Sequence, residues 1–251
     1  MVFHMELNGG NVLSIISVMV GTTAFLLGLF VYLANKRSLT NQVFFALTLS
    51  MALWIAAVLV ALSSGDREIV LLSRKLAFAA ASFIAFLMFY FSYLFPKPNA
   101  YRLPSWLLVF LPCSMALVAV FTNYILQDID FVEGVQHNVY GQGYYVFSVY
   151  FFGFLLGGIY NFLSKKKQLN AVETVQMGLV LTGLVVSAVL AAFTNLILPK
   201  ILETYSTGQL GPIAVSFFVI LATYAIFKHR LFSIGLVVVE FLVSTMWLFI
   251  I

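Results

Sequence analysis

Few residues of this chain have the types and spacing that covalent chemistry or metal binding requires. The three histidines, His4, His137 and His229, fall in separate polar stretches, and the single cysteine, Cys113, lies inside an apolar one. A zinc-type site needs three or four such ligands held together, and neither glycine-rich nucleotide motif occurs. The sequence therefore predicts no catalytic residue, no metal site and no cofactor, and we expect a protein that is not an enzyme.

The composition is that of a membrane protein. Hydrophobic residues make up 63% of the chain and charged residues 9%, with a mean hydropathy of +1.05. Soluble domains carry about 25% charged residues, and several apolar stretches here reach the roughly 20 residues that a helix needs to cross a bilayer. Spanning uses up nearly the whole chain, which leaves no room for a soluble catalytic domain.

The apolar stretches predict an all-α polytopic membrane protein, a bundle of seven transmembrane helices with an eighth apolar helix at the C-terminus. The seven expected segments are 11–34, 40–62, 70–95 (starting at Val70 or Leu76), 103–122, 143–163, 173–198 and 210–227. Residues 1–234 would form the membrane region, and 235–251 would begin a further apolar helix that is cut off here. The longest polar stretch, 123–142, is expected to be a loop.

The basic residues predict the orientation. Cytoplasmic loops carry an excess of Lys and Arg, and nine of the 13 fall on one side if the N-terminus lies outside: Lys36, Arg37, Lys97, Arg102, Lys165, Lys166, Lys167, Lys228 and Arg230. Arg67, Arg74, Lys75 and Lys200 remain on the other side with most of the acidic residues. We expect segment seven to end in the cytoplasm. The positive net charge belongs to this pattern, and no nucleic-acid partner is inferred from it.

The interiors of the seven segments contain almost no ionisable group. A charge at the centre of a bilayer costs about 2.5–3.5 kcal/mol on insertion scales, so it usually marks a functional site. An ion-coupled transporter would need such a group, and a retinal protein would need a lysine inside segment seven. The bundle is therefore better suited to relaying a change of shape, with a small transporter or lipid-handling protein, or a membrane scaffold, as alternatives.

Four residues are candidates for ligand binding on the outer side. Arg74 either extends to the headgroups or points inward toward an anionic ligand. Tyr144 and Tyr145, after Gly141 and Gly143, form either an interfacial aromatic belt or the wall of a ligand cup lidded by the acidic loop. Asn195 either hydrogen-bonds between helices or belongs to the same site.

Several motifs resemble a known family. Gly211-Pro212 opens a charge-free helix that ends in Tyr224-Ala225-Ile226, and the polar run Lys228-His229-Arg230 follows. This is similar to the last core helix of the seven-transmembrane sensor region at the N-terminus of bacterial histidine kinases. Residues 74–78 with Phe95-Pro96, residues 141–145, and residues 194–199 are similar to that family's third, fifth and sixth helices. The resemblance covers roughly residues 11–234.

The resemblance implies a sensory role. It implies the membrane-embedded input region of a two-component histidine kinase, located in the bacterial inner membrane and relaying an outer or intramembrane signal to cytoplasmic modules absent from this chain. Tyr224, Lys228, His229 and Arg230 would hand the signal over. The partners would be the bilayer and the cytoplasmic transmitter domain, with a homodimer formed through the full-length parent. This chain itself shows neither a phosphoacceptor-histidine helix nor ATP-binding motifs.

Overall fold

The computed structural model describes residues 9–97, 105–132, 135–202 and 210–229. Helices account for most of them, in the order α1 (Gly9–Ala34), α2 (Leu39–Ser63), α3 (Arg67–Leu94), α4 (Ser105–Phe121), α5 (Gly143–Lys165), α6 (Ala171–Ala192), α7 (Leu198–Leu202) and α8 (Leu210–His229). Two short helical elements lie between them, the 3₁₀-helix Lys166–Gln168 and the π-helix η2 (Phe193–Ile197). Since α6, η2 and α7 follow one another without a break, the described residues form seven rods, as the sequence predicts.

Five of these rods are long and apolar enough to cross a membrane: α1, α2, α3, α5 with the 3₁₀ turn, and α6 through α7. Two shorter apolar helices, Phe110–Phe121 and Leu210–Ile226, lie in α4 and α8. Polar side chains start several helices. Asp66 accepts hydrogen bonds from the backbone N–H groups of Glu68 and Ile69, and Asn170 forms a reciprocal capping box with Glu173. Such caps satisfy backbone donors that the first turn leaves unpaired.

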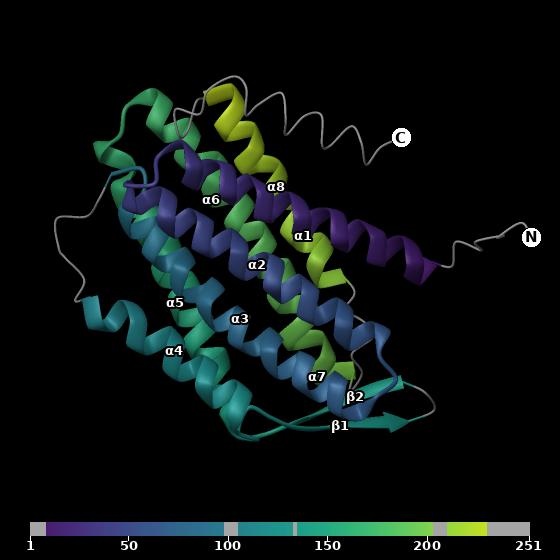
Figure 1. Ribbon diagram of the computed structural model, residues 1–251. Coiled ribbons are helices and arrows are strands. Elements are labelled where there is room, and N and C mark those ends of the chain that lie inside the picture. Colours follow the sequence, from purple (N-terminus) through teal and green to yellow (C-terminus); the bar gives the residue numbers. More distant parts are fainter. Residues whose placement is uncertain (1–8, 98–104, 133–134, 203–209, 230–251) are drawn as a thin grey trace, which may run out of the picture.

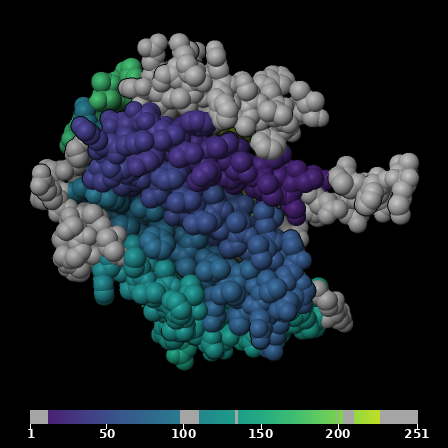
Figure 2. Space-filling view, viewed as in Figure 1, coloured from purple at the N-terminus to yellow at the C-terminus, as the bar shows by residue number. Residues whose placement is uncertain are grey.

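The rods pack as a closed ring with one helix outside it. The order around the ring is α1, α2, α3, α5, α6, α8 and back to α1, while α4 packs on the outside of α3 (Figure 1). The contact between α5 and α6 is much less extensive than that between α5 and α3. On the face in Figure 2, α1, α2, α3 and α4 form a continuous surface.

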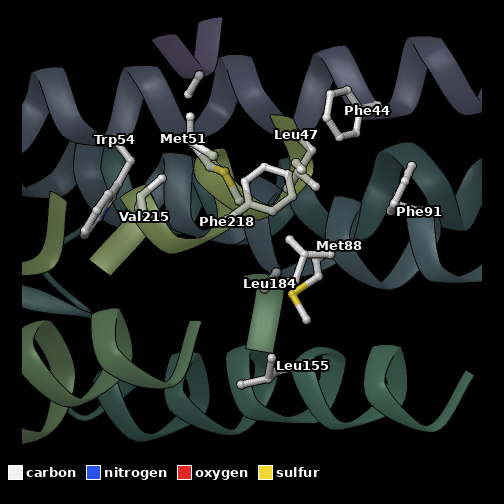
Figure 3. Packing of buried hydrophobic residues seen from close by; sticks show 14 of the residues in the cluster. Phe44, Leu47, Met51, Trp54, Met88, Phe91, Leu155, Leu184, Val215 and Phe218 are labelled. Atoms are coloured by element: carbon white, nitrogen blue, oxygen red, sulfur yellow. The ribbon is translucent and has the colours of Figure 1, made fainter. Parts of the chain in front are cut away.

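The core of the ring is rich in aromatic residues. Phe44 of α2 lies 5.6 Å from Phe91 of α3 and 5.9 Å from Phe218 of α8, measured between ring centroids. All three side chains are fully buried, and Figure 3 shows them with Met51, Trp54 and Leu184 around them. Burying large apolar side chains where helices meet fixes the packing of α2, α3 and α8.

The stretch 123–142, expected to be a loop, forms an antiparallel hairpin. Strand β1 (Leu126–Val132) pairs with β2 (Val135–Tyr140), and the hairpin lies across the end of the bundle where α2 meets α3 (Figure 1). We call this the hairpin end, and the opposite end, which carries Lys165, Lys166 and Lys167, the lysine end. Leu126 and Ile129 are fully buried against Ala61 and Val70. The hairpin is thus a packed part of the fold.

The eighth apolar helix expected at 235–251 lies outside the described residues.

Candidate functional site

A cavity lies inside the ring near the hairpin end. The room inside it for the centres of water-sized spheres is about 80 Å³, and all the space between its walls, including solvent at its mouth, is about 910 Å³. Residues of α2, α3, α5, α6, η2, α8 and β2 line it. The walls are apolar along most of the length, and Figure 3 shows Met88, Leu155 and Leu184 from α3, α5 and α6 gathered around the same region.

Arg74 lies at the polar end of this cavity. Its side chain is 2% exposed, and its guanidinium donates a hydrogen bond to the Oε1 atom of Gln136 on β2. Gln136 in turn donates from Nε2 to the backbone carbonyls of Ala61, at 2.9 Å, and Ser64, at 3.2 Å. Arg74 is therefore inside the bundle, connected through the hairpin to the last turn of α2. Its neighbour Lys75 is also buried and donates to Asn123 Oδ1 at 2.7 Å.

Arg67 binds strand β1 on the exposed side of the hairpin. Its Nε atom donates to Asp128 Oδ1 at 3.1 Å and to the Ile129 carbonyl at 3.0 Å, and Asp130 lies 3.8 Å from its guanidinium. Exposed ion pairs contribute little to stability, so the buried side chains of Leu126 and Ile129 must hold the hairpin in place. Their packing makes the hairpin a cover over the polar end of the cavity.

Asn195 lines the cavity from the π-helix η2. Its Nδ2 atom donates to the Ala191 carbonyl at 3.0 Å and to Thr194 Oγ1 at 2.9 Å. A π-turn inserts one extra residue into a helix and leaves the local hydrogen bonding irregular. The start of α8 approaches here so closely that a Cβ atom on Gly211 would lie 2.0 Å from Asn195 Nδ2 and 2.7 Å from Trp54.

The two tyrosines have different surroundings. Tyr144 is buried, and its hydroxyl donates to the carbonyl of Leu196 in η2. Its ring lies 4.3 Å from that of Tyr140 and 6.4 Å from that of Phe78, between centroids. Tyr145 is 64% exposed and is not among the lining residues. The structure thus brings Arg74, Asn195 and Tyr144 to one end of the bundle and leaves Tyr145 on its outer surface.

A second polar cluster, which the sequence reasoning missed, lies at the lysine end. Lys165 is 4% exposed, and its Nζ atom contacts four backbone carbonyls: Ser92 at 2.8 Å, Tyr93 at 2.7 Å, Phe95 at 3.2 Å and Lys97 at 2.6 Å. These carbonyls belong to the last turn of α3 and the segment after it, which includes the cis peptide bond Phe95–Pro96. A cation suits the carbonyl end of a helix, so Lys165 ties the end of α5 to the end of α3.

An ion pair extends this cluster to α6. Lys97 Nζ lies 3.0 Å from Glu173 Oε2, and Glu173 also caps the first turn of α6. The ends of α3, α5 and α6 are therefore connected through Lys165, Lys97 and Glu173. We call these three residues the lysine-end network.

The expected relay residues lie at or beyond the end of α8. Tyr224 is half exposed in its penultimate turn. Lys228 and His229 belong to the last turn, where the backbone alone is described, and Arg230 lies outside the described residues.

A comparison with protein families identifies the chain. A family model described as the N-terminal 7TM region of histidine kinase matches residues 16–235. The chain belongs to this family. The match covers α1 from residue 16 onward, the other five ring helices, α4 and the hairpin, so the cavity and the lysine-end network both lie within it. A search of curated proteins found no match.

This 7TM region is the membrane-embedded sensory input part of a histidine kinase, and it is not the kinase's catalytic domain. Membership implies a parent protein with a cytoplasmic transmitter domain and a location in a bacterial membrane. The family favours this sensory function over the transporter or lipid-handling alternative.

Proposed function

We propose that this 7TM region senses a ligand in the cavity near the hairpin end. The site consists of Arg74 and Asn195 at the polar end, with Tyr144 as a positioning residue that holds η2 through the Leu196 carbonyl. Tyr145 is left out because its side chain faces away from the cavity lining. One observation supports the proposal above all: α3, α5 and α6 line the cavity and are also the helices joined by the lysine-end network.

The distribution of charge supports an orientation with the hairpin end outside. Lys36, Arg37 and Lys97 lie at the lysine end together with Lys165, Lys166 and Lys167. Asp66, Glu68, Asp128 and Asp130 lie at the hairpin end. An excess of lysine and arginine favours the cytoplasmic side. The N-terminus would then be outside, and α8 would end in the cytoplasm.

The relay would follow from two alternative packings of the ring. A ligand shifts such an equilibrium only by its difference in affinity for the two states. Filling the space between α3, α5 and α6 favours the packing with the wider cavity, and the lysine-end network transmits the displacement to the other end of these helices. Since α8 packs along α6, the change would reach Tyr224, Lys228, His229 and Arg230, and then the transmitter domain. We propose that the full-length kinase works as a homodimer.

The test is autophosphorylation of the full-length kinase in lipid nanodiscs. Ala188 lines the cavity from α6, whereas Ala56 is exposed on α2 and does not line it. Ala188→Leu fills part of the cavity and should change basal autophosphorylation at least threefold, which corresponds to a shift of about 0.7 kcal/mol. Ala56→Leu adds the same side chain toward lipid and should change nothing. Equal activity of both variants and wild type would refute the proposal.

A further inference from the structure

The shape of the cavity restricts what can bind in it. Along α3 the lining runs from Arg74 to Met88, a span of 14 residues that corresponds to about 21 Å of helix. Alanine residues provide the room, because they line the cavity from both α3 and α6: Ala77, Ala81, Ala85, Ala188, Ala191 and Ala192. A long, narrow and apolar space of this kind suits one extended hydrocarbon chain better than a compact polar metabolite.

Most polar side chains of the lining are concentrated at one end of this space, and Ser187, between Leu184 and Ala188, already accepts a hydrogen bond from the Phe218 N–H at 2.8 Å. Arg74, Asn138 and Asn195 lie toward the hairpin, and the opposite end is formed by Met88, Leu155 and Leu184 (Figure 3). The Asn138 Oδ1 atom is buried and has no hydrogen-bond partner among the described residues. Buried polar atoms are normally paired, and an amide oxygen only accepts hydrogen bonds, so a donor such as a water molecule fits beside it.

Arg74 gives this end its charge preference. Its guanidinium is already withdrawn from water, so an anionic headgroup that reaches it gains a charge-assisted hydrogen bond in a low-dielectric environment. A carboxylate matches the planar geometry of a guanidinium especially well. Together, the chain-like apolar space and the cation at its end describe an amphiphile with an acidic headgroup.

We propose that the cavity binds an anionic amphiphile with a single apolar chain, of the fatty-acid class. Its chain would lie along α3 and α6, and its carboxylate would contact Arg74 beneath the hairpin. Such a molecule partitions into the bilayer that surrounds the helices, so its local concentration is high. This inference rests on the sensory site proposed above and specifies the chemistry of its ligand.

The test uses this 7TM chain in phosphatidylcholine nanodiscs with a dodecanoate probe that carries a photoreactive diazirine on its chain. Labelling should fall on lining residues of α3, α5 or α6 and should be displaced by unlabelled dodecanoate. Dodecanol has the same chain without the charge and should compete at least about tenfold less well, which corresponds to about 1.4 kcal/mol, because it has no carboxylate to pair with Arg74. Equal competition by the two compounds would rule out an anionic ligand.

Variants separate the chain from the headgroup. Ala188→Leu should reduce labelling about tenfold, because it occupies the path of the chain, and Ala56→Leu should label as wild type does. Arg74→Gln should abolish the advantage of dodecanoate over dodecanol in the competition. Lys200→Gln is the control, because it removes a positive charge from an exposed site at the same end of the bundle, and it should preserve that advantage. Unchanged competition by dodecanol in Arg74→Gln shows that the variant is folded. Labelling of Ala188→Leu at the wild-type level would overturn the proposed location.

The kinase assay distinguishes a failure of this inference from a failure of the sensory proposal. If Ala188→Leu changes autophosphorylation but dodecanoate does not label the cavity, the sensory site stands and the ligand class is wrong. If labelling behaves as expected but Ala188→Leu and Ala56→Leu give the same kinase activity, the cavity binds amphiphiles without controlling the kinase.

Discussion

The hydroxyl of Tyr144 donates a hydrogen bond to the backbone carbonyl of Leu196, within the π-helix that continues α6. This bond joins the first turn of α5 to the one irregular turn of the described part of α6–α7, beside the cavity residue Asn195. An irregular turn persists only where surrounding groups favour it, and Tyr144 is such a group.

Tyr144→Phe should therefore destabilise the protein. The substitution keeps the ring packing on Tyr140 and Phe78 but removes the donor, which leaves a buried carbonyl without that partner at a cost of about 1–2 kcal/mol. We expect a lower thermal unfolding midpoint in maltoside micelles. Tyr145→Phe, at the exposed neighbouring position, is the matched control and should change the free energy of unfolding by less than about 0.5 kcal/mol. Equal effects of the two variants would contradict this role of Tyr144.

Lys165→Met should have a larger effect. The Nζ atom of Lys165 contacts four carbonyls at the end of α3 and has three N–H groups to donate to them. Since hydrogen bonds from a charged donor contribute about 1.5–3 kcal/mol each, a loss of at least about 3 kcal/mol is expected. Lys166→Met is the control, because Lys166 is the next residue and its side chain is exposed. Both variants remove one positive charge from the same end. A similar unfolding midpoint for both would show that the buried contacts of Lys165 contribute little.

Lys97→Met should give a smaller and salt-dependent effect. Lys97 pairs with Glu173 across 3.0 Å, but its side chain is 53% exposed, and exposed ion pairs are weak and screened by salt. At low ionic strength, the unfolding midpoint of the Lys97→Met variant should fall less than that of the Lys165→Met variant. In about 1 M NaCl, where the Debye length is about 3 Å, the difference from wild type should vanish. A difference that survives at high salt would indicate that Lys97 acts through packing.

Gly183→Ala should weaken the contact between α6 and α8. A Cβ atom on Gly183 would lie 3.0 Å from Phe218 Cα and 3.2 Å from Leu221 Cβ, and Phe218 N–H also donates to Ser187 Oγ at 2.8 Å. Overpacking of this kind costs about 1–3 kcal/mol. Gly178→Ala, on the same helix with open space around its Cβ, should instead be neutral or stabilising by up to about 1 kcal/mol. If the two substitutions changed the unfolding midpoint by the same amount, the close contact between α6 and α8 at Gly183 would be refuted.

The helices were predictable because each apolar segment is long and is ended by polar residues that favour a boundary. The hairpin at 126–140 was not, since its strands do not alternate cleanly: Leu126 and Ile129 are buried, but Val132 and Val135 are exposed. Its packing depends on Ala61 and Val70, which are far away in the sequence. Contacts with distant residues therefore stabilise the hairpin, and the pattern of apolar and polar residues along 126–140 did not indicate it.

The candidate site was predictable in part. Arg74 stood out because it lies at the start of segment three, where an arginine can point inward toward an anionic ligand, and its side chain lines the cavity. Lys165 did not stand out, because it belongs to the run Lys165–Lys167, which reads as an ordinary cytoplasmic boundary. Its burial depends on four carbonyls presented by another helix, which no spacing along the chain reveals. The π-turn at Asn195 was invisible for the same reason, because its partner, Tyr144, comes from α5.

The central claim is that filling the cavity repositions α8 relative to α5. The most direct measurement is the distance between spin labels at Leu163→Cys and Ile220→Cys, two exposed positions on these helices, in a Cys113→Ser background. Ala188→Leu should shift the distance by about 1–2 Å, the scale of helix movements in signalling proteins, and Ala56→Leu should leave it unchanged. Identical distance distributions in the two variants would contradict the claim.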